Sequence, residues 1–109
     1  MFCFSAQVDF LKAVIIVRVA TQGRQDYRQW VTHYYLRYAL DGIHFVDYKQ
    51  KHGRKYFPGN RDQNTVKSYP LVPNIKTRYI RIMPWHWYGH ISMRAEFYGC
   101  FAGWWEVKK

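Results

Sequence analysis

The stretch that most constrains the fold is residues 30–40, in which the side chains alternate along the chain. One face carries Thr32, Tyr34, Leu36, Tyr38 and Leu40, and the other carries Val31, His33, Tyr35, Arg37 and Ala39. A period of two predicts a β-strand that buries one face. Residues 22–29 precede it as a loop with a glycine hinge. Asp41 and Gly42 follow it as a hairpin signal, because glycine accepts the positive φ that such turns need.

The rest of the chain reads as further short strands separated by turns. We predict strands at residues 6–10, 13–20, 43–48, 65–69, 78–83 and 91–98, with a short one at 55–57. Residues 11–12 are predicted as a turn, 49–64 and 84–90 as loops, and 70–74 as a proline-containing connector. No stretch shows a helical period. The pattern favours an all-β sandwich or barrel in one domain, residues 1–100, with residues 101–109 as a tail.

The charge balance points to anionic partners. The 109 residues carry 17 basic and 7 acidic side chains, a net charge of +10. Such an excess favours acidic membrane surfaces, sulfated glycans or nucleic acid. Residues 13–17 are the longest wholly apolar run, far shorter than the ~20 residues that a membrane span needs, and residues 1–10 lack the basic start of a signal peptide. The two cysteines are too few for a disulfide framework or a zinc site.

Strand counting assigns the loops to ends. Antiparallel strands joined by local connections alternate in direction, so loops 22–29, 49–64 and 84–90 should share one end. Seven cations against two carboxylates would give that end a net charge of +5, half that of the chain. Tyr27, Trp30, Trp85, Trp87 and Tyr88 would lie there too. We expect Trp30 and Trp87 in the core, and Tyr27 and Trp85 as contact residues.

Several blocks in order carry a family resemblance. They are TQGR at 21–24, WVT at 30–32, DG at 41–42, FPGNRD at 57–62, RYIRIMP at 78–84, Trp87, and ISMRAEFYGC at 91–100. Together they closely resemble the discoidin domain, also called the coagulation factor 5/8 type C domain. The resemblance implies a jelly-roll β-sandwich or barrel of the galactose-binding-domain-like type, with ligand-binding loops at one end. It also implies an extracellular, non-catalytic adhesion module, whose relatives variously bind phosphatidylserine membranes, carbohydrate, collagen or other receptors.

The resemblance also implies that the first strands and two binding loops of the domain are missing here. The cysteine that resembles Cys100 pairs in the family with one at the domain's start, so Cys100 is expected to be a free or intermolecular thiol. Strand counting puts Cys3 and Cys100 at opposite ends, ~20 Å apart along a six-residue strand, whereas a disulfide needs Cα atoms within ~7 Å. We predict that the two are not bonded to each other.

The function predicted is a binding module for an anionic phospholipid membrane, a glycan, or an extracellular receptor or matrix protein. The residues predicted to bind are Arg24, Asp26, Tyr27, Arg28, Arg54, Lys55, Trp85, Trp87, Tyr88 and Arg94. Arg94 alternates outward, and its expected role is divided evenly between the ligand end and a contact near Glu96.

Two alternatives stay open at this point. A basic, aromatic-rich nucleic-acid-binding domain is the rival class, although no nucleic-acid motif occurs. A non-binding fragment of a larger adhesion protein is another. Catalysis is not expected, because the five histidines lack an acidic partner at a telling spacing. His86 and His90 are two potential metal ligands without a third, so neither a metal nor a cofactor is predicted.

Overall fold

All regular elements are antiparallel strands over the part of the chain that the computed structural model describes, residues 6–101. The strands are β1 (Ala6–Gln22), β2 (Trp30–Ala39), β3 (Val46–Asp47), β4 (Lys49–Gln50), β5 (Gly53–Arg54), β6 (Phe57–Pro58), β7 (Lys67–Tyr88) and β8 (Arg94–Phe101). The main sheet has the order β3-β2-β7-β1-β8, with β6 also paired to β2, whereas β4 and β5 form a separate two-stranded sheet. The predicted all-β class is confirmed. No helix among residues 6–101 is long and apolar enough to cross a membrane.

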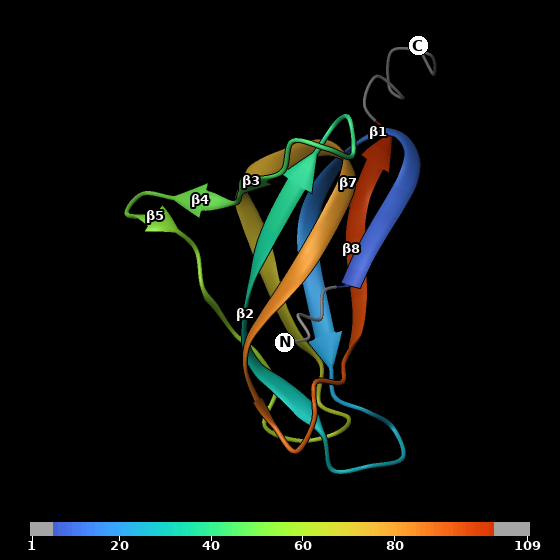
Figure 1. Cartoon of the computed structure of the whole chain (residues 1–109), viewed down its shortest axis with the longest axis vertical. Coiled ribbons are helices and arrows are strands. Elements are labelled where there is room, and N and C mark those ends of the chain that lie inside the picture. Colours follow the sequence, from blue (N-terminus) through green and yellow to red (C-terminus); the bar gives the residue numbers. More distant parts are fainter. Residues whose placement is uncertain (1–5, 102–109) are drawn as a thin grey trace.

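The two long strands β1 and β7 each bend back at a corner, so that a single sheet forms two layers. Residues 6–9 of β1 pair with residues 79–82 of β7, and residues 14–21 pair with residues 67–77. Both strands turn back at the end where β2 finishes (Figure 1). Leu11 adopts a φ of 70° at this corner, so the turn predicted at residues 11–12 is a bend within the continuous strand β1 and does not separate two strands. In β7, the buried Thr77 hydroxyl lies 2.8 Å from the carbonyl oxygens of Ala39 and Tyr79 and can donate its one hydrogen to either, so its burial at the corner is compensated.

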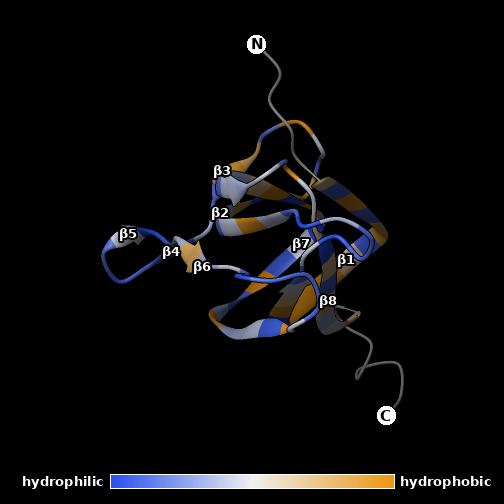
Figure 2. Cartoon of the chain, turned by 90° about the horizontal axis from the view of Figure 1, so that it is seen from below, coloured by the Kyte–Doolittle hydropathy of each residue, from blue (hydrophilic) through white to orange (hydrophobic). Residues whose placement is uncertain are grey.

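The core lies between the two layers. It contains β-branched and aliphatic side chains of β1 and β7 and aromatic side chains from β2 and the segments after it: Val14, Ile16, Val19, Val31, Tyr34, Leu36, Tyr48, Phe57, Leu71, Ile75, Ile80 and Ile82. The Tyr34 and Phe57 rings stack with centroids 5.1 Å apart. The ribbon seen from below shows the hydrophobic strands around this interior (Figure 2). Burial on this scale is the main stabilising contribution in a small β-domain.

The period-two prediction for residues 30–40 holds only in part. Tyr34 and Leu36, on one face, are fully buried, but Val31 and Ala39, on the other face, are buried too, at 0% and 3% exposure. The pairing of β2 with β7 shifts between Val31 and Tyr34, so a bulge changes the face on which residues point. Leu40, assigned to the same face as Tyr34 and Leu36, is 59% exposed beyond the end of the strand.

Several predicted element boundaries are wrong. The predicted connector at residues 70–74 and most of the predicted loop at residues 84–90 belong to β7. The prolines are tolerated because the register with β1 shifts between Ile16 and Arg18, where β7 has extra residues. The strand predicted at residues 43–48 is reduced to the two residues of β3. The last strand, predicted at residues 91–98, begins at Arg94 and continues past Gly99 to Phe101, and its Ala95 is exposed.

The Asp41–Gly42 hairpin signal is confirmed. Tyr38 pairs with Val46 across the turn between β2 and β3. Asp41 Oδ1 accepts backbone bonds from Ile43 and His44 at 2.8 and 2.9 Å, and Gly42 has a φ of 74°. A side chain on Gly42 would be strained at this φ and would press against the Tyr79 ring.

The structure does not test the prediction that Cys3 and Cys100 are not bonded to each other. Cys3 lies outside the described residues. Cys100, in β8, is a free and exposed thiol.

Candidate functional site

Three loops meet at the end of the sandwich opposite the corners of β1 and β7. We call residues 23–29, 59–66 and 89–93 the loop end (Figure 1). Arg94, at the start of β8, holds two of these loops. Its Nε donates to the Gly23 carbonyl at 2.8 Å, and its Nη2 donates to the Gln63 carbonyl at 2.8 Å and to Asn64 Oδ1 at 2.9 Å. Arg94 therefore positions the loops, a role that the alternation pattern did not predict.

Further polar contacts tie the loop end together. Gln63 Nε2 donates to the Gln25 carbonyl at 3.1 Å, and the Ser92 hydroxyl donates to Gln29 Oε1 at 3.0 Å. Asn60 is fully buried, and its Nδ2 donates to the carbonyl groups of Thr21 and Thr65. These residues were missed at the sequence level, although the FPGNRD block that contains Asn60 marked the segment.

The first loop presents an aromatic side chain beside an exposed arginine. Tyr27 is 54% exposed, and the Arg24 guanidinium lies 4.2 Å from its ring centroid. Arg24 Nε also donates to Asp26 Oδ1 at 2.8 Å, and this bond holds the pKa of Asp26 below its usual value. Both partners of that pair are exposed, so the pair contributes little stability but fixes Arg24 over the ring. Arg28, next in the chain, is exposed.

The second loop is ordered by Asp62. Its carboxylate accepts bonds from the Thr65 hydroxyl and amide at 2.6 and 2.8 Å and from the Asn64 amide at 3.2 Å. These bonds, with that of the Thr65 hydroxyl the largest cause, lower the pKa of Asp62. Arg61 beside it is exposed.

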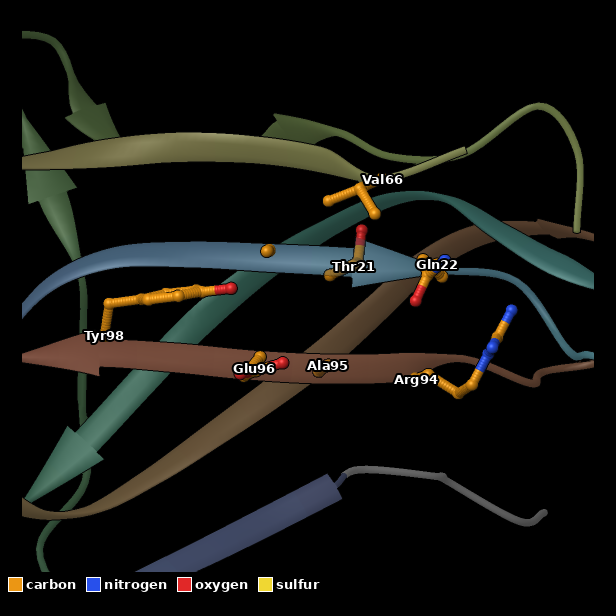
Figure 3. Close-up of a pocket in the computed structure, with 8 residues that line it drawn as sticks. Thr21, Gln22, Val66, Arg94, Ala95, Glu96 and Tyr98 are labelled. Carbon is orange, nitrogen blue, oxygen red and sulfur yellow. The ribbon is translucent and has the colours of Figure 1, made fainter. Parts of the chain in front are cut away.

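A pocket opens on the flank of the loop end. It has a volume of about 90 Å³ and lies between the end of β1 and the start of β8 (Figure 3). Gln22, Val66, Arg94, Glu96 and Tyr98 are among the residues that line it. Tyr98 is 42% exposed and Glu96 is exposed, so a ring and a carboxylate face solvent together on β8.

The predicted site residues divide into two groups in space. Arg24, Asp26, Tyr27 and Arg28 lie at the loop end, and Tyr88 and Arg94 border it at the end of β7 and the start of β8. Trp87 is 45% exposed one residue before Tyr88, so the expectation that it belongs to the core is wrong. Trp30 is half-buried and stacks on Tyr88 with centroids 4.7 Å apart.

Arg54, Lys55 and Trp85 do not join the loop end. The β4–β5 hairpin projects from the side of the sandwich, above the middle of β2 in the view of Figure 1. Tyr48 anchors it, because its amide donates to Leu36 and its hydroxyl donates to the Pro73 carbonyl at 2.8 Å. The predicted loop 49–64 therefore splits, and only its second half reaches the loop end.

The split changes the charge of the loop end. Residues 23–29, 59–66 and 89–93 hold three arginines and two aspartates, a net charge of +1 rather than the predicted +5. The four cations of the difference, Lys49, Lys51, Arg54 and Lys55, lie on or beside the hairpin. Among residues 6–101, no three His, Cys, Asp or Glu side chains gather closely enough to hold a metal ion. His86 lies beside His33, with ring centroids 5.6 Å apart.

The sequence matches the family whose description is F5/8 type C domain over residues 4–97. The chain belongs to this family. It is 41% identical over 98 residues to the human EGF-like repeat and discoidin I-like domain-containing protein 3, covering 86% of this chain and 20% of that protein. It is 42% identical over 82 residues to discoidin-2 of Dictyostelium discoideum, covering 75% of this chain and 31% of that protein. The chain thus spans a third or less of the length of these relatives.

Solved structures agree on the fold. Recombinant discoidin II of Dictyostelium discoideum superposes with a TM-score of 0.81 at 35% identity, covering 90% of this chain and 38% of that chain. A CBM32 domain of a family 31 glycoside hydrolase from Clostridium perfringens superposes with a TM-score of 0.64 at 23% identity, covering 88% of this chain and 68% of that one. The discoidin-like β-sandwich predicted from the sequence blocks is confirmed.

Proposed function

We propose that this chain is a non-catalytic, extracellular binding module that attaches to a membrane containing anionic phospholipid through its loop end. Membership in the F5/8 type C family supports a binding role. The observation that carries the choice of surface is Tyr27, a ring 54% exposed on a projecting loop, next to the exposed Arg28. Amphipathic rings settle at the depth of lipid headgroups, and an arginine near the surface adds ~1 kcal/mol of attraction to anionic lipid.

The order within the loop end supports the same proposal. Arg94, Gln63 and Ser92 bond across loops, and Arg24 covers one face of the Tyr27 ring. A loop that is already ordered loses little conformational entropy on binding. The net charge of only +1 makes the ring, rather than long-range attraction, the larger contribution at this end.

The test is co-sedimentation with phosphatidylcholine vesicles, with and without phosphatidylserine. We expect binding that requires phosphatidylserine and that Tyr27→Ala weakens about tenfold, equivalent to ~1.4 kcal/mol. Leu40→Ala is the matched control, because Leu40 is 59% exposed at the opposite end. Equal losses in the two variants, or equal binding to both vesicle types, would contradict the proposal.

A second candidate is carbohydrate binding in the flank pocket of Figure 3. The exposed Tyr98 ring offers a face for a sugar, and the Glu96 carboxylate can accept bonds from sugar hydroxyl groups. Arg94 forms one wall but already donates its bonds to the loops. A glycan array would favour this candidate if a retained glycan is lost in Tyr98→Ala and kept in Tyr27→Ala.

A further inference from the structure

We propose that the basic hairpin, residues 49–56, and the neighbouring Trp85 form a second site, which binds a sulfated polysaccharide. This site is separate from the loop end and does not depend on what the loop end binds. It stands on three features of the molecule: uncompensated charge, a concave shape and a fixed pair of exposed rings.

The hairpin holds cations that lack acidic partners. Asp47 is the only acidic residue in the segment 46–56, and it pairs with Arg37 at 2.9 Å and with Arg54 at 2.8 Å. Within residues 6–101, no carboxylate lies at ion-pairing distance from Lys49, Lys51 or Lys55. Four cations against one carboxylate leave a net charge of +3 on this short segment. A polyanion is the partner that such a density of charge favours.

The cations surround a hollow. An open concavity of about 350 Å³ lies beside the hairpin, and Lys51, His52, Arg54, Lys55, Tyr56 and Val72 are among its lining residues. Sulfate groups that enter it would receive charge-assisted bonds from Lys51 and Lys55. Gln50 Nε2 donates to the Val72 carbonyl at 3.2 Å, which ties the hairpin to β7 on one side of the hollow.

Exposed rings continue the surface beyond the hollow. Tyr56 and Trp85 are 41% and 50% exposed, and their ring centroids lie 5.5 Å apart. Arg54 holds this pair in place. Its guanidinium lies 4.1 Å from the Tyr35 ring centroid, Nη1 donates to the Tyr56 hydroxyl at 3.1 Å, and Nε and Nη2 donate to Asp47. Since Arg54 is occupied in this way, it acts as a support, and Lys51 and Lys55 supply the charge for the ligand. Lys55 Nζ lies 5.6 Å from the Phe57 ring centroid, a contact that leaves its positive charge without a carboxylate partner.

A sulfated sugar chain matches both halves of this surface. The C–H face of a pyranose ring can lie on an aromatic side chain, while its sulfate groups reach the lysines. A bilayer fits less well, because the hairpin tip carries Lys51, His52 and Gly53 and no apolar side chain that could enter lipid. Trp85 lies within β7, on the side of the sandwich, rather than at a tip.

The experiment measures binding of the whole chain to immobilised heparin at several salt concentrations, with fully desulfated heparin and a single-stranded oligonucleotide as competitors. We expect Lys51→Gln/Lys55→Gln to weaken binding about tenfold at low salt and to reduce the slope of log K against log salt by about 1.5, since two ionic contacts are lost. Lys67→Gln/Lys76→Gln is the matched control, because it removes the same charge from two exposed lysines on β7. Thermal melting curves establish that all variants fold.

Each outcome of this experiment either supports or contradicts the proposed site. Loss in the hairpin variant alone, with competition by heparin and none by desulfated heparin, supports the site. Equal loss in both double variants would show a response to net charge and overturn it, as would unchanged binding in the hairpin variant. Competition by the oligonucleotide at the same concentration would indicate that the site binds a nucleic acid rather than a glycan. Tyr27→Ala should leave heparin binding unchanged, so failure of the membrane proposal and failure of this one are distinguishable.

Discussion

The loop end and the basic hairpin differ in how their polar groups are used. At the loop end, Arg24, Arg94 and Asp62 bond to neighbouring loops or side chains, and the net charge is +1. In the hairpin segment 46–56, only Arg54 has an acidic partner, and the net charge is +3. Bonded groups order a surface but have little left for a ligand, whereas unpaired lysines offer charge without order. The loop end therefore offers an ordered surface to a ligand, whereas the hairpin offers positive charge.

The substitution expected to have the largest effect on stability removes the side chain of Asn60, which connects the second loop to β1. Asn60→Ala deletes two bonds to the carbonyl groups of Thr21 and Thr65 and the bond that Oδ1 accepts from the buried Thr21 hydroxyl at 3.0 Å. We expect the free energy of unfolding to fall by about 3 kcal/mol, because buried polar groups lose their partners. Urea denaturation measures it. Asn74→Ala, at an exposed asparagine on β7, should change stability by less than about 0.5 kcal/mol. A loss below about 1 kcal/mol for Asn60→Ala would refute the assigned role.

Two glycines, Gly23 at the loop end and Gly53 in the hairpin, provide a second comparison of the two regions, with a smaller expected effect. A Cβ on Gly23 would lie 2.6 Å from the Asp62 carbonyl oxygen and 2.9 Å from Trp30 Cβ, where loops and strand pack closely. Gly53, in the hairpin, has a φ of 107° but open space around it. We expect Gly23→Ala to destabilise the fold by about 2 kcal/mol. Gly53→Ala should cost under about 1 kcal/mol, because the strained hairpin can relax without disturbing the core.

Thermal unfolding and vesicle binding distinguish the two glycine variants. Gly23→Ala should lower both the melting temperature and binding to phosphatidylserine vesicles. Gly53→Ala should leave vesicle binding as it is. The reverse order of stability would mean that the hairpin is the more tightly integrated of the two regions.

Much of the fold was accessible from the sequence because burial imposes a period of two on most strands. Ile80 and Ile82 are two residues apart in the strand predicted at residues 78–83, and both are buried. The order of the blocks gave the family and the sandwich. Val31 departs from the alternation, because a bulge in β2 changes the period without a local sequence signal. The connector at residues 70–74 was misassigned for the same reason, since prolines are permitted where β7 carries extra residues.

The site was harder to predict, because position along the chain does not show the direction in which a segment leaves the sandwich. Counting strands correctly brought residues 22–29 to the same end as the second half of 49–64 and the end of 84–90. It could not show that Tyr48 buries its ring and bonds to Pro73, and so pins the hairpin to the side. Arg94 was included among the predicted ligand-binding residues. Its bonds to Gly23 and Gln63 could not be foreseen, because both partners are distant from it in sequence.

The smallest predicted effect concerns acid. Hydrogen bonds from Thr65 lower the pKa of Asp62, so the folded state binds the proton of this group less readily than the unfolded state does. The stabilisation from Asp62 is present above the unfolded pKa of about 3.9 and is lost as pH falls through the lower folded value. Below about pH 4, hydrogen exchange at the amides of Asn64 and Thr65, corrected for intrinsic rates, should therefore accelerate. The Lys55 amide is the internal control, because it donates to the Tyr48 carbonyl rather than to a carboxylate, and its protection should persist. Asp62→Asn should remove most of the pH dependence at the loop end and none at the hairpin. If the Lys55 amide loses protection first, the hairpin depends on acid-sensitive contacts too, and the contrast between the two surfaces fails.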